Sequence, residues 1–304
     1  MKRRDFIQKT AASSALLGLS NVALSSFTSL DTKKITILHT NDVHSHIDPF
    51  PADHPRNANM GGASRRAALI DSIRKEETNV LLLDAGDIFQ GTPYFNYYGG
   101  ELEFKLMSMM QYDLATMGNH DFDNGIEGFY AQLPHAKFDF VSANYDFKNT
   151  ILNDIVKPYK IFKKGGLKIG VFGLGVELDG LVDKKMYKET VYIDPVEIAQ
   201  DMARILKEEQ KCDLVICLSH LGFNYKNDPD KISDLALAKK TKDIDLIIGG
   251  HTHTFLDKPV IEKNSDGKEV LINQVGCYGI NLGRIDFYFS NDTEVKNQGK
   301  NIIV

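Results

Sequence analysis

The stretch Gly249-Gly250-His251-Thr252-His253 decides how the rest of this chain is understood. It follows the apolar run at residues 244–248, which predicts a short, buried β-strand. Two imidazoles two residues apart on the loop that leaves a strand can both point toward one place. Because this pattern alone is only moderately specific, the other strand ends of the chain have to decide what it means.

Four earlier predicted strands end in residues of the same kind. They are Asp42 and His44 after residues 33–38, Asp87 after 79–84, Asn119 and His120 after 113–116, and His220 after 213–218. Helical patterns alternate with these strands, so the sequence predicts an α/β fold, in which ligands bind where the strands end. Carboxylate, amide and imidazole groups at five strand ends suit divalent ions such as Zn or Mn, and so many chance placements are improbable.

Composition is that of a soluble globular protein, and the length allows one large domain or one domain with a small appendage. The formal net charge of −5 argues against nucleic-acid binding, which requires a basic face. Any attraction for an anionic substrate must therefore be local, and bound metal ions could supply it. The three cysteines show no spacing typical of a metal or redox motif, which favours a role in the core.

The N-terminus predicts an export signal. Lys2-Arg3-Arg4-Asp5-Phe6 precedes a modestly apolar run at residues 11–24, which is too short and too polar for a stable membrane anchor. The arginine pair resembles a twin-arginine signal, although an ordinary basic signal remains an alternative. We therefore expect a periplasmic or otherwise exported protein, with residues 1–30 as signal and spacer.

Two further segments allow more than one interpretation. Residues 90–100 are rich in glycine and aromatic residues and predict a loop that lines a pocket, forms a partner surface or packs on the core. Arg65 and Arg66 begin a predicted helix at residues 63–75. A phosphate-binding role is possible for them, but a solvated or carboxylate-paired role is favoured.

Taken in order, the strand-end motifs resemble those of the calcineurin-like metallophosphoesterases. The matching motifs are Asp42-x-His44, Gly86-Asp87, Gly118-Asn119-His120-Asp121-Phe122-Asp123, Ser219-His220-Leu221-Gly222 and Gly250-His251-Thr252-His253. The third and fourth resemble the branch of 5′-nucleotidases and UDP-sugar hydrolases. The resemblance implies a four-layer α/β/β/α sandwich with mixed sheets, spanning residues 31–290 and followed by a polar tail at 291–304.

The resemblance also implies a site with two divalent metal ions. It assigns Asp42, His44 and His253 to one ion, Asn119, His220 and His251 to the other, and Asp87 to both. His120 would contact the phosphate. The resemblance also implies that Asp123 orients His120. Independently of the resemblance, the i+3 spacing on a turn allows Asp123 to hold the His120 ring in one tautomer.

The function that the resemblance implies is metal-dependent phosphate-ester hydrolysis by a metal-activated hydroxide, foremost of a nucleoside 5′-monophosphate. Two alternatives within enzymes are a 2′,3′-cyclic-nucleotide phosphodiesterase and a UDP-sugar pyrophosphatase. A third is a catalytic subunit that needs a separate chain carrying the 5′-nucleotidase C-terminal domain, since substrate-binding residues of the branch lie there. The alternative outside enzymes is a metal-binding partner protein.

Overall fold

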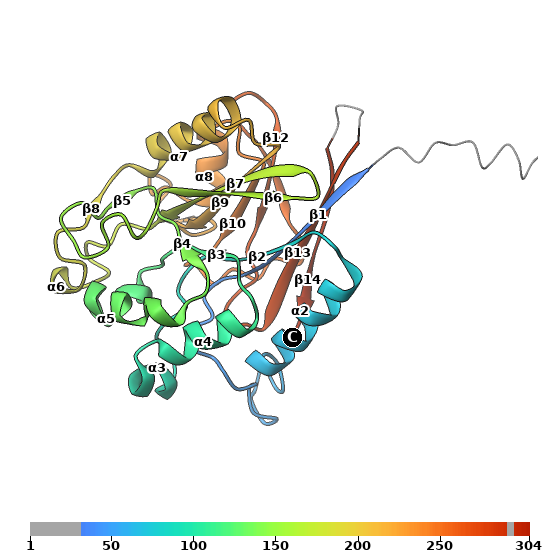
Figure 1. The fold of residues 1–304 in the computed structure, drawn as a ribbon. Coiled ribbons are helices and arrows are strands. Elements are labelled where there is room, and N and C mark those ends of the chain that lie inside the picture. Colours follow the sequence, from blue (N-terminus) through green and yellow to red (C-terminus); the bar gives the residue numbers. More distant parts are fainter. Residues whose placement is uncertain (1–31, 291–294) are drawn as a thin grey trace, which may run out of the picture.

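Two mixed six-stranded β-sheets face each other in the computed structural model, which describes residues 32–290 and 295–304 (Figure 1). The first sheet has, in spatial order, β14 (Lys296–Ile303), β13 (Asn281–Phe289), β1 (Lys33–Thr40), β2 (Val80–Asp84), β3 (Leu114–Ala115) and β4 (Asp139–Phe140). Strands β1 to β4 are parallel, β13 is antiparallel to β1, and β14 is antiparallel to β13.

The second sheet repeats this plan of a parallel centre. Its order is β11 (Val260–Lys263), β12 (Glu269–Asn273), β10 (Leu246–Gly249), β9 (Leu214–His220), β7 (Leu167–Gly175) and β6 (Tyr159–Lys164). The four inner strands are parallel, whereas β11 and β6 pair antiparallel at the edges. A small ribbon, β5 (Tyr145–Asp146) with β8 (Val191–Tyr192), lies beside it.

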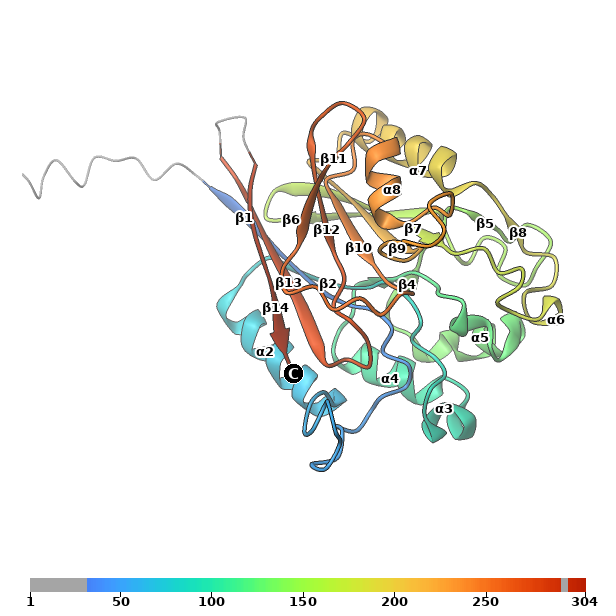
Figure 2. The same ribbon diagram turned by 180° about the vertical axis from the view of Figure 1, so that it is seen from behind.

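Helices cover the outer face of each sheet. Those associated with the first sheet are α2 (Ala63–Glu76), α3 (Pro93–Tyr98), α4 (Glu101–Met109) and α5 (Gly125–Gln132), with the 3₁₀ turns His120–Phe122 and Leu133–His135. On the second sheet, α7 (Pro195–Arg204) continues into the π-helical turn Ile205–Glu209 and lies beside α8 (Asp234–Lys240) (Figure 2). The short α6 (Lys184–Tyr187) lies near α5.

Three apolar layers separate these four layers of secondary structure. Side chains such as Ile35 and Val171 fill the space between the two sheets. Successive strand residues point to opposite faces of a sheet, so the same strands also fill the outer layers. Leu38 packs in the layer under α2 and α4, and Phe172 packs in the layer under α7 and α8. Strands buried on both faces explain the continuous apolar runs in the sequence. The predicted α/β/β/α sandwich with mixed sheets is confirmed.

The end of the chain differs from the sequence-based prediction. Residues 291–304 were expected to form a polar tail, but Lys296–Ile303 is the edge strand β14. Its Ile302, together with the following Val304, packs on the core under α2, while the exposed residues of the strand are mostly polar. The amide N–H of Gly61 donates to the Val304 carbonyl oxygen at 2.9 Å, which ties this end to the start of α2.

Residues 90–100 also differ from prediction, since they contain α3 rather than only a loop. Pro93 supplies the fixed φ that favours the first helical position, and Gly99 ends the helix at a φ of 62°. The cysteines Cys212, Cys217 and Cys277 are buried and free, as predicted. The predicted export signal lies outside the described residues. Within residues 32–290 and 295–304, no helix is long and apolar enough to cross a membrane.

Candidate metal centre

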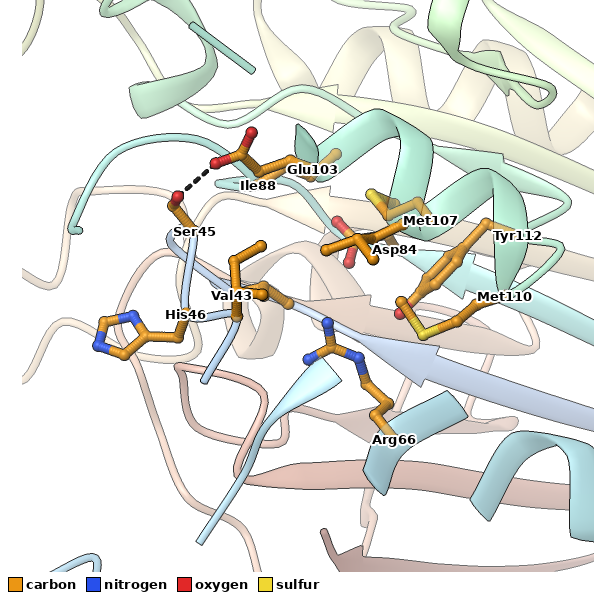
Figure 3. Close-up of a pocket in the computed structure, with 12 residues that line it drawn as sticks. Val43, Ser45, His46, Arg66, Asp84, Ile88, Glu103, Met107, Met110 and Tyr112 are labelled. Atoms are coloured by element: carbon orange, nitrogen blue, oxygen red, sulfur yellow. Dashed lines mark hydrogen bonds between the residues drawn. The ribbon is translucent and has the colours of Figure 1, made fainter. Parts of the chain in front are cut away.

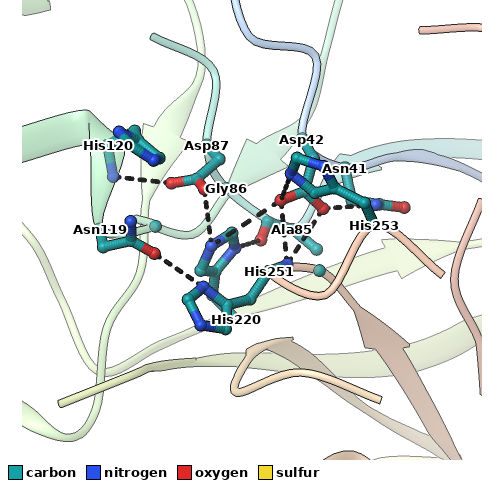
Figure 4. Close-up of polar contacts among 12 residues, drawn as sticks. Asn41, Asp42, Ala85, Gly86, Asp87, Asn119, His120, His220, His251 and His253 are labelled. Carbon is teal, nitrogen blue, oxygen red and sulfur yellow. Dashed lines mark hydrogen bonds and ion pairs between the residues drawn. The ribbon is translucent and has the colours of Figure 1, made fainter. Parts of the chain in front are cut away.

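The carboxyl ends of the parallel strands in both sheets meet at one edge of the sandwich, and the predicted site residues lie together there (Figure 4). The segments after strands of the first sheet contribute Asp42, His44, Asp87, Asn119 and His120. In the second sheet, His220 is the last residue of β9, and His251 and His253 follow β10. Parallel strands end at the same edge of a sheet, which is why residues so far apart in sequence come together.

Asp42, His44, Asp87 and His253 form a first group, each offering a ligand atom within 4.8 Å of the others. His44 Nε2 lies 3.0 Å from His253 Nε2 and 3.7 Å from Asp87 Oδ2. His253 Nε2 lies 3.4 Å from Asp42 Oδ1. Lone pairs and carboxylate oxygens thus converge on one small volume.

A second group consists of Asp87, His220 and His251, again with ligand atoms within 4.8 Å of one another. His220 Nε2 lies 3.1 Å from Asp87 Oδ2, and Asn119 Oδ1 lies 2.8 Å from His251 Nδ1. Asp87 belongs to both groups. The arrangement therefore offers two adjoining positions for a cation, with one carboxylate between them.

Burial and charge show that these residues fit divalent ions. Asp42, Asp87 and His220 are at most 1% exposed. His220 Nδ1 lies 2.7 Å from the carbonyl oxygen of Ala85, and its buried Nε2 faces the Asp87 carboxylate. Burial lowers the pKa of His220, but the charge of the Asp87 carboxylate outweighs this and raises the pKa to about 10. A buried carboxylate is unfavourable unless a positive charge lies beside it, and a bound cation would supply that charge.

The backbone of these loops is held in an unusual conformation. A left-handed φ costs a residue with a side chain roughly 1–3 kcal/mol, and such strain gathers at functional sites. Five predicted ligands adopt it: Asp42 (49°), His44 (50°), Asp87 (56°), His251 (70°) and His253 (51°). Hydrogen bonds between the loops keep them there, for example from the His44 N–H to the Asp87 carbonyl oxygen at 3.0 Å.

His120 and Asp123 form the pair that the sequence predicted. His120 Nδ1 lies 2.8 Å from Asp123 Oδ2, and the hydrogen bond with Asp123 raises the pKa of His120 despite partial burial. The His120 N–H donates to Asp87 Oδ1 at 2.8 Å, and its ring meets that of His44 edge-on at 5.2 Å. The imidazole is therefore oriented beside the metal centre while its side chain remains 38% exposed.

The role of Asp121 is not predicted by the sequence. Its buried carboxylate accepts backbone N–H bonds from Asp87, Ile88, Phe89 and Gly118, at 2.8 to 3.2 Å. These bonds join the turn after β2 to the turn after β3. Asp121 lies inside the Gly118–Asp123 motif that the sequence predicts as part of the site. Its role is not predicted, because its hydrogen-bond partners are backbone groups and no sequence pattern indicates them.

Asn41 and Gln274 hold the two remaining loops and were also missed. Asn41 Nδ2 donates to Asp42 Oδ2 at 2.6 Å and to the carbonyl oxygen of Gly276 at 2.7 Å. Gln274 Nε2 donates to the carbonyl oxygen of Gly250 at 2.5 Å, and its Oε1 accepts from Thr252 Oγ1 and from the Thr254 N–H. Gln274 directly follows β12, so its position at a strand end is the signal that the sequence offers.

A cavity of about 450 Å³ opens beside the centre. His44, His120 and His253 line its inner part. The residues that line it include five histidines and Arg56, and none of them carries a carboxylate. This combination is suited to an anionic ligand.

A second, much smaller cavity of about 20 Å³ lies behind the loop after β1 (Figure 3). Arg66 is only 3% exposed there, and its Nε and Nη1 have no hydrogen-bond partner among the described residues. Burial raises the pKa of Asp84 to about 7, and the charge of Arg66 opposes this shift. The volume is about that of one water molecule, so the cavity is too small for a substrate.

Comparison with known proteins agrees with this geometry. The family model described as calcineurin-like phosphoesterase matches residues 35–255. The trifunctional nucleotide phosphoesterase YfkN of Bacillus subtilis is 35% identical over 302 residues, covering 89% of this chain and 19% of that protein. The snake venom 5′-nucleotidase of Naja atra is also 35% identical, covering 89% of this chain and 53% of the venom protein.

A solved structure described as the 5′-nucleotidase precursor from Thermus thermophilus has the same fold, with a TM-score of 0.81 and 31% identity. The match covers 89% of this chain and 54% of that one. The chain thus spans about a fifth of the Bacillus protein and about half of the venom enzyme. The family model covers most of the chain, and the strand ends of the chain carry the motifs described above. The chain therefore belongs to the calcineurin-like phosphoesterase family.

Proposed function

We propose that this chain hydrolyses phosphoric monoesters, foremost nucleoside 5′-monophosphates, using two divalent metal ions such as Zn or Mn. The observation that carries the proposal is the pair of ligand groups that share Asp87, next to a cavity suited to an anion. Its relatives in Naja atra and Homo sapiens bear the name 5′-nucleotidase, which supports the choice of substrate.

The proposed ligand set follows the two groups. Asp42, His44 and His253 would hold one ion, and Asn119, His220 and His251 would hold the other, with Asp87 shared. Divalent ions held there would supply positive charge for the phosphate oxygens and would lower the pKa of water.

His120 acts on the phosphate from the side of the cavity. Because its Nδ1 is engaged by Asp123, Nε2 is left to meet the substrate. In the imidazolium form, which the Asp123 carboxylate favours, His120 stabilises the negative charge that develops on the phosphate and can protonate the leaving alkoxide. Asp123 is thus a positioning residue for His120.

Hydrolysis of AMP by the purified chain with Mn²⁺ or Zn²⁺ tests the proposal. His120→Asn should lower kcat by roughly 10²- to 10⁴-fold with metals still bound. His135→Asn, which changes a histidine outside the centre, is the matched control and should leave kcat unchanged. Undiminished hydrolysis by His120→Asn would contradict the role of His120. Inactivity of the wild-type chain toward AMP, cyclic nucleotides and UDP-sugars alike would contradict the proposed function.

A broader nucleotide phosphoesterase is the second candidate, favoured by the description of the Bacillus relative as trifunctional. A panel of AMP, 2′,3′-cyclic AMP and UDP-glucose ranks the two candidates. A separate chain that carries a 5′-nucleotidase C-terminal domain is added in a parallel assay. A large gain in activity on its addition would identify this chain as a catalytic subunit.

We also propose that the N-terminal residues direct export by the twin-arginine route. Arg3→Lys together with Arg4→Lys should retain the protein inside the cell, measured by fractionation. Unchanged export of this double variant would instead indicate the general secretory route.

A further inference from the structure

A row of aromatic rings leads outward from the metal centre along the large cavity. We name Tyr278, His46, Phe50 and His54 the aromatic wall. Tyr278 and His46 lie 4.2 Å apart between ring centroids, His46 and Phe50 5.3 Å, and Phe50 and His54 4.6 Å. At its inner end, the ring of Tyr278 lies 5.8 Å from His253 and 6.0 Å from His44.

The aromatic wall is built by two loops that the fold fixes beside the centre. The Tyr278 N–H donates to the Asp42 carbonyl oxygen at 2.7 Å, which ties this residue directly to a proposed ligand. The Phe50 N–H donates to the Met60 carbonyl oxygen at 2.9 Å and closes the other loop. The backbone that carries Tyr278 and Phe50 is therefore fixed before a ligand binds, which reduces the entropy lost on binding.

The aromatic wall faces the cavity and is not part of the core. All four of its residues are only half-buried, and all four line the cavity that His120 also lines. Arg56, on the same loop as Phe50 and His54, lines the cavity too, and its charge acts on Tyr278. A ligand whose phosphate lies beside His120 would place the group esterified to that phosphate against these rings.

We propose that the aromatic wall is the subsite that binds the base of a nucleotide by stacking, so that this chain itself selects for a nucleoside leaving group. The proposal rests on the phosphomonoesterase function proposed above. Every nucleobase offers a planar π-face, and one base stacked on an aromatic side chain contributes roughly 5- to 150-fold in binding, judged from alanine substitution. A sugar phosphate without a base gains none of this.

The test compares AMP with ribose 5-phosphate, which keeps the phosphate and the ribose but lacks the base. We expect the wild-type chain, loaded with Mn²⁺, to favour AMP in kcat/KM by about tenfold or more. Tyr278→Ala and Phe50→Ala should each reduce this ratio at least about fivefold, and Tyr278→Phe, which keeps the ring, should preserve it. Tyr97→Ala is the matched control, since Tyr97 is 82% exposed on α3 and does not line this cavity.

Binding of adenosine provides a second measurement that does not depend on catalysis or on added metal. Saturation-transfer NMR should show the strongest transfer to the protons of the base with the wild-type chain and Tyr97→Ala, and a loss of transfer with Tyr278→Ala. Equal kcat/KM for the two substrates, or a ratio and an NMR signal that Tyr278→Ala leaves unchanged, would overturn the subsite. Hydrolysis of neither substrate would contradict the proposed function, and the adenosine measurement would then decide the subsite alone.

Discussion

Replacing Asp121 should destabilise the fold far more than replacing Asp123, although the two carboxylates lie two residues apart in one motif. Asp121→Ala leaves four buried N–H donors without an acceptor, on Asp87, Ile88, Phe89 and Gly118. Each unsatisfied buried donor costs about 1–3 kcal/mol, so the loss should be at least about 4 kcal/mol. That is a large part of the stability of a typical domain.

Urea unfolding of metal-free protein, followed by circular dichroism, measures this difference. Because Asp121→Ala could fail to fold, Asp121→Asn is the decisive variant. Its amide keeps one acceptor oxygen but turns an NH₂ group toward two N–H donors, so we expect a loss of at least about 2 kcal/mol. Asp123→Asn, whose side chain is 29% exposed and bonds only to His120 in the described structure, should lose about 1 kcal/mol or less. Equal losses for the two asparagine variants would refute the reasoning.

Three further predictions concern Gln274, Asp84 and the bound metal ions. Gln274→Leu removes the bonds that hold the loop of His251 and His253, and should weaken Mn²⁺ binding roughly 10- to 100-fold in a chelator competition, whereas unchanged affinity would contradict this. Because burial raises the pKa of Asp84 to about 7, its neutral form is favoured on folding, and the stability this provides at acidic pH is lost as pH rises from about 4 through 7, by up to about 4 kcal/mol. Asp84→Asn should show a flatter pH dependence of the unfolding free energy over that interval, and parallel curves would be inconsistent with the shift. Removal of divalent metal by a chelator should lower the Tm, and Mn²⁺ should restore it, because an ion bound only by the folded state stabilises that state; a Tm that ignores both treatments would argue against the centre.

Much of the fold and of the candidate centre could be predicted because both follow from local patterns. Parallel strands that are buried on both faces give continuous apolar runs in the sequence. The candidate metal ligands lie at or just after the ends of these strands, as Asp87 does after β2 and His220 does at the end of β9. The resemblance of these motifs to a known family then implied the four layers and the mixed sheets.

What could not be predicted depends on contacts between distant segments. The strand β14 is at a sheet edge, so most of its side chains are polar and resemble a tail. Asp121 and Gln274 act through backbone groups of other loops, which leave no periodic signal. The aromatic wall joins Tyr278 to a loop more than two hundred residues earlier, a proximity that only the tertiary structure creates.

The number of metal ions bound per chain tests the central claim most directly. The two groups that share Asp87 predict that a Mn²⁺ titration followed by electron paramagnetic resonance will find two ions bound per wild-type chain, and that His251→Ala and His253→Ala will each impair one of the two binding events. A single ion per wild-type chain, or no tightly bound ion, would contradict the account.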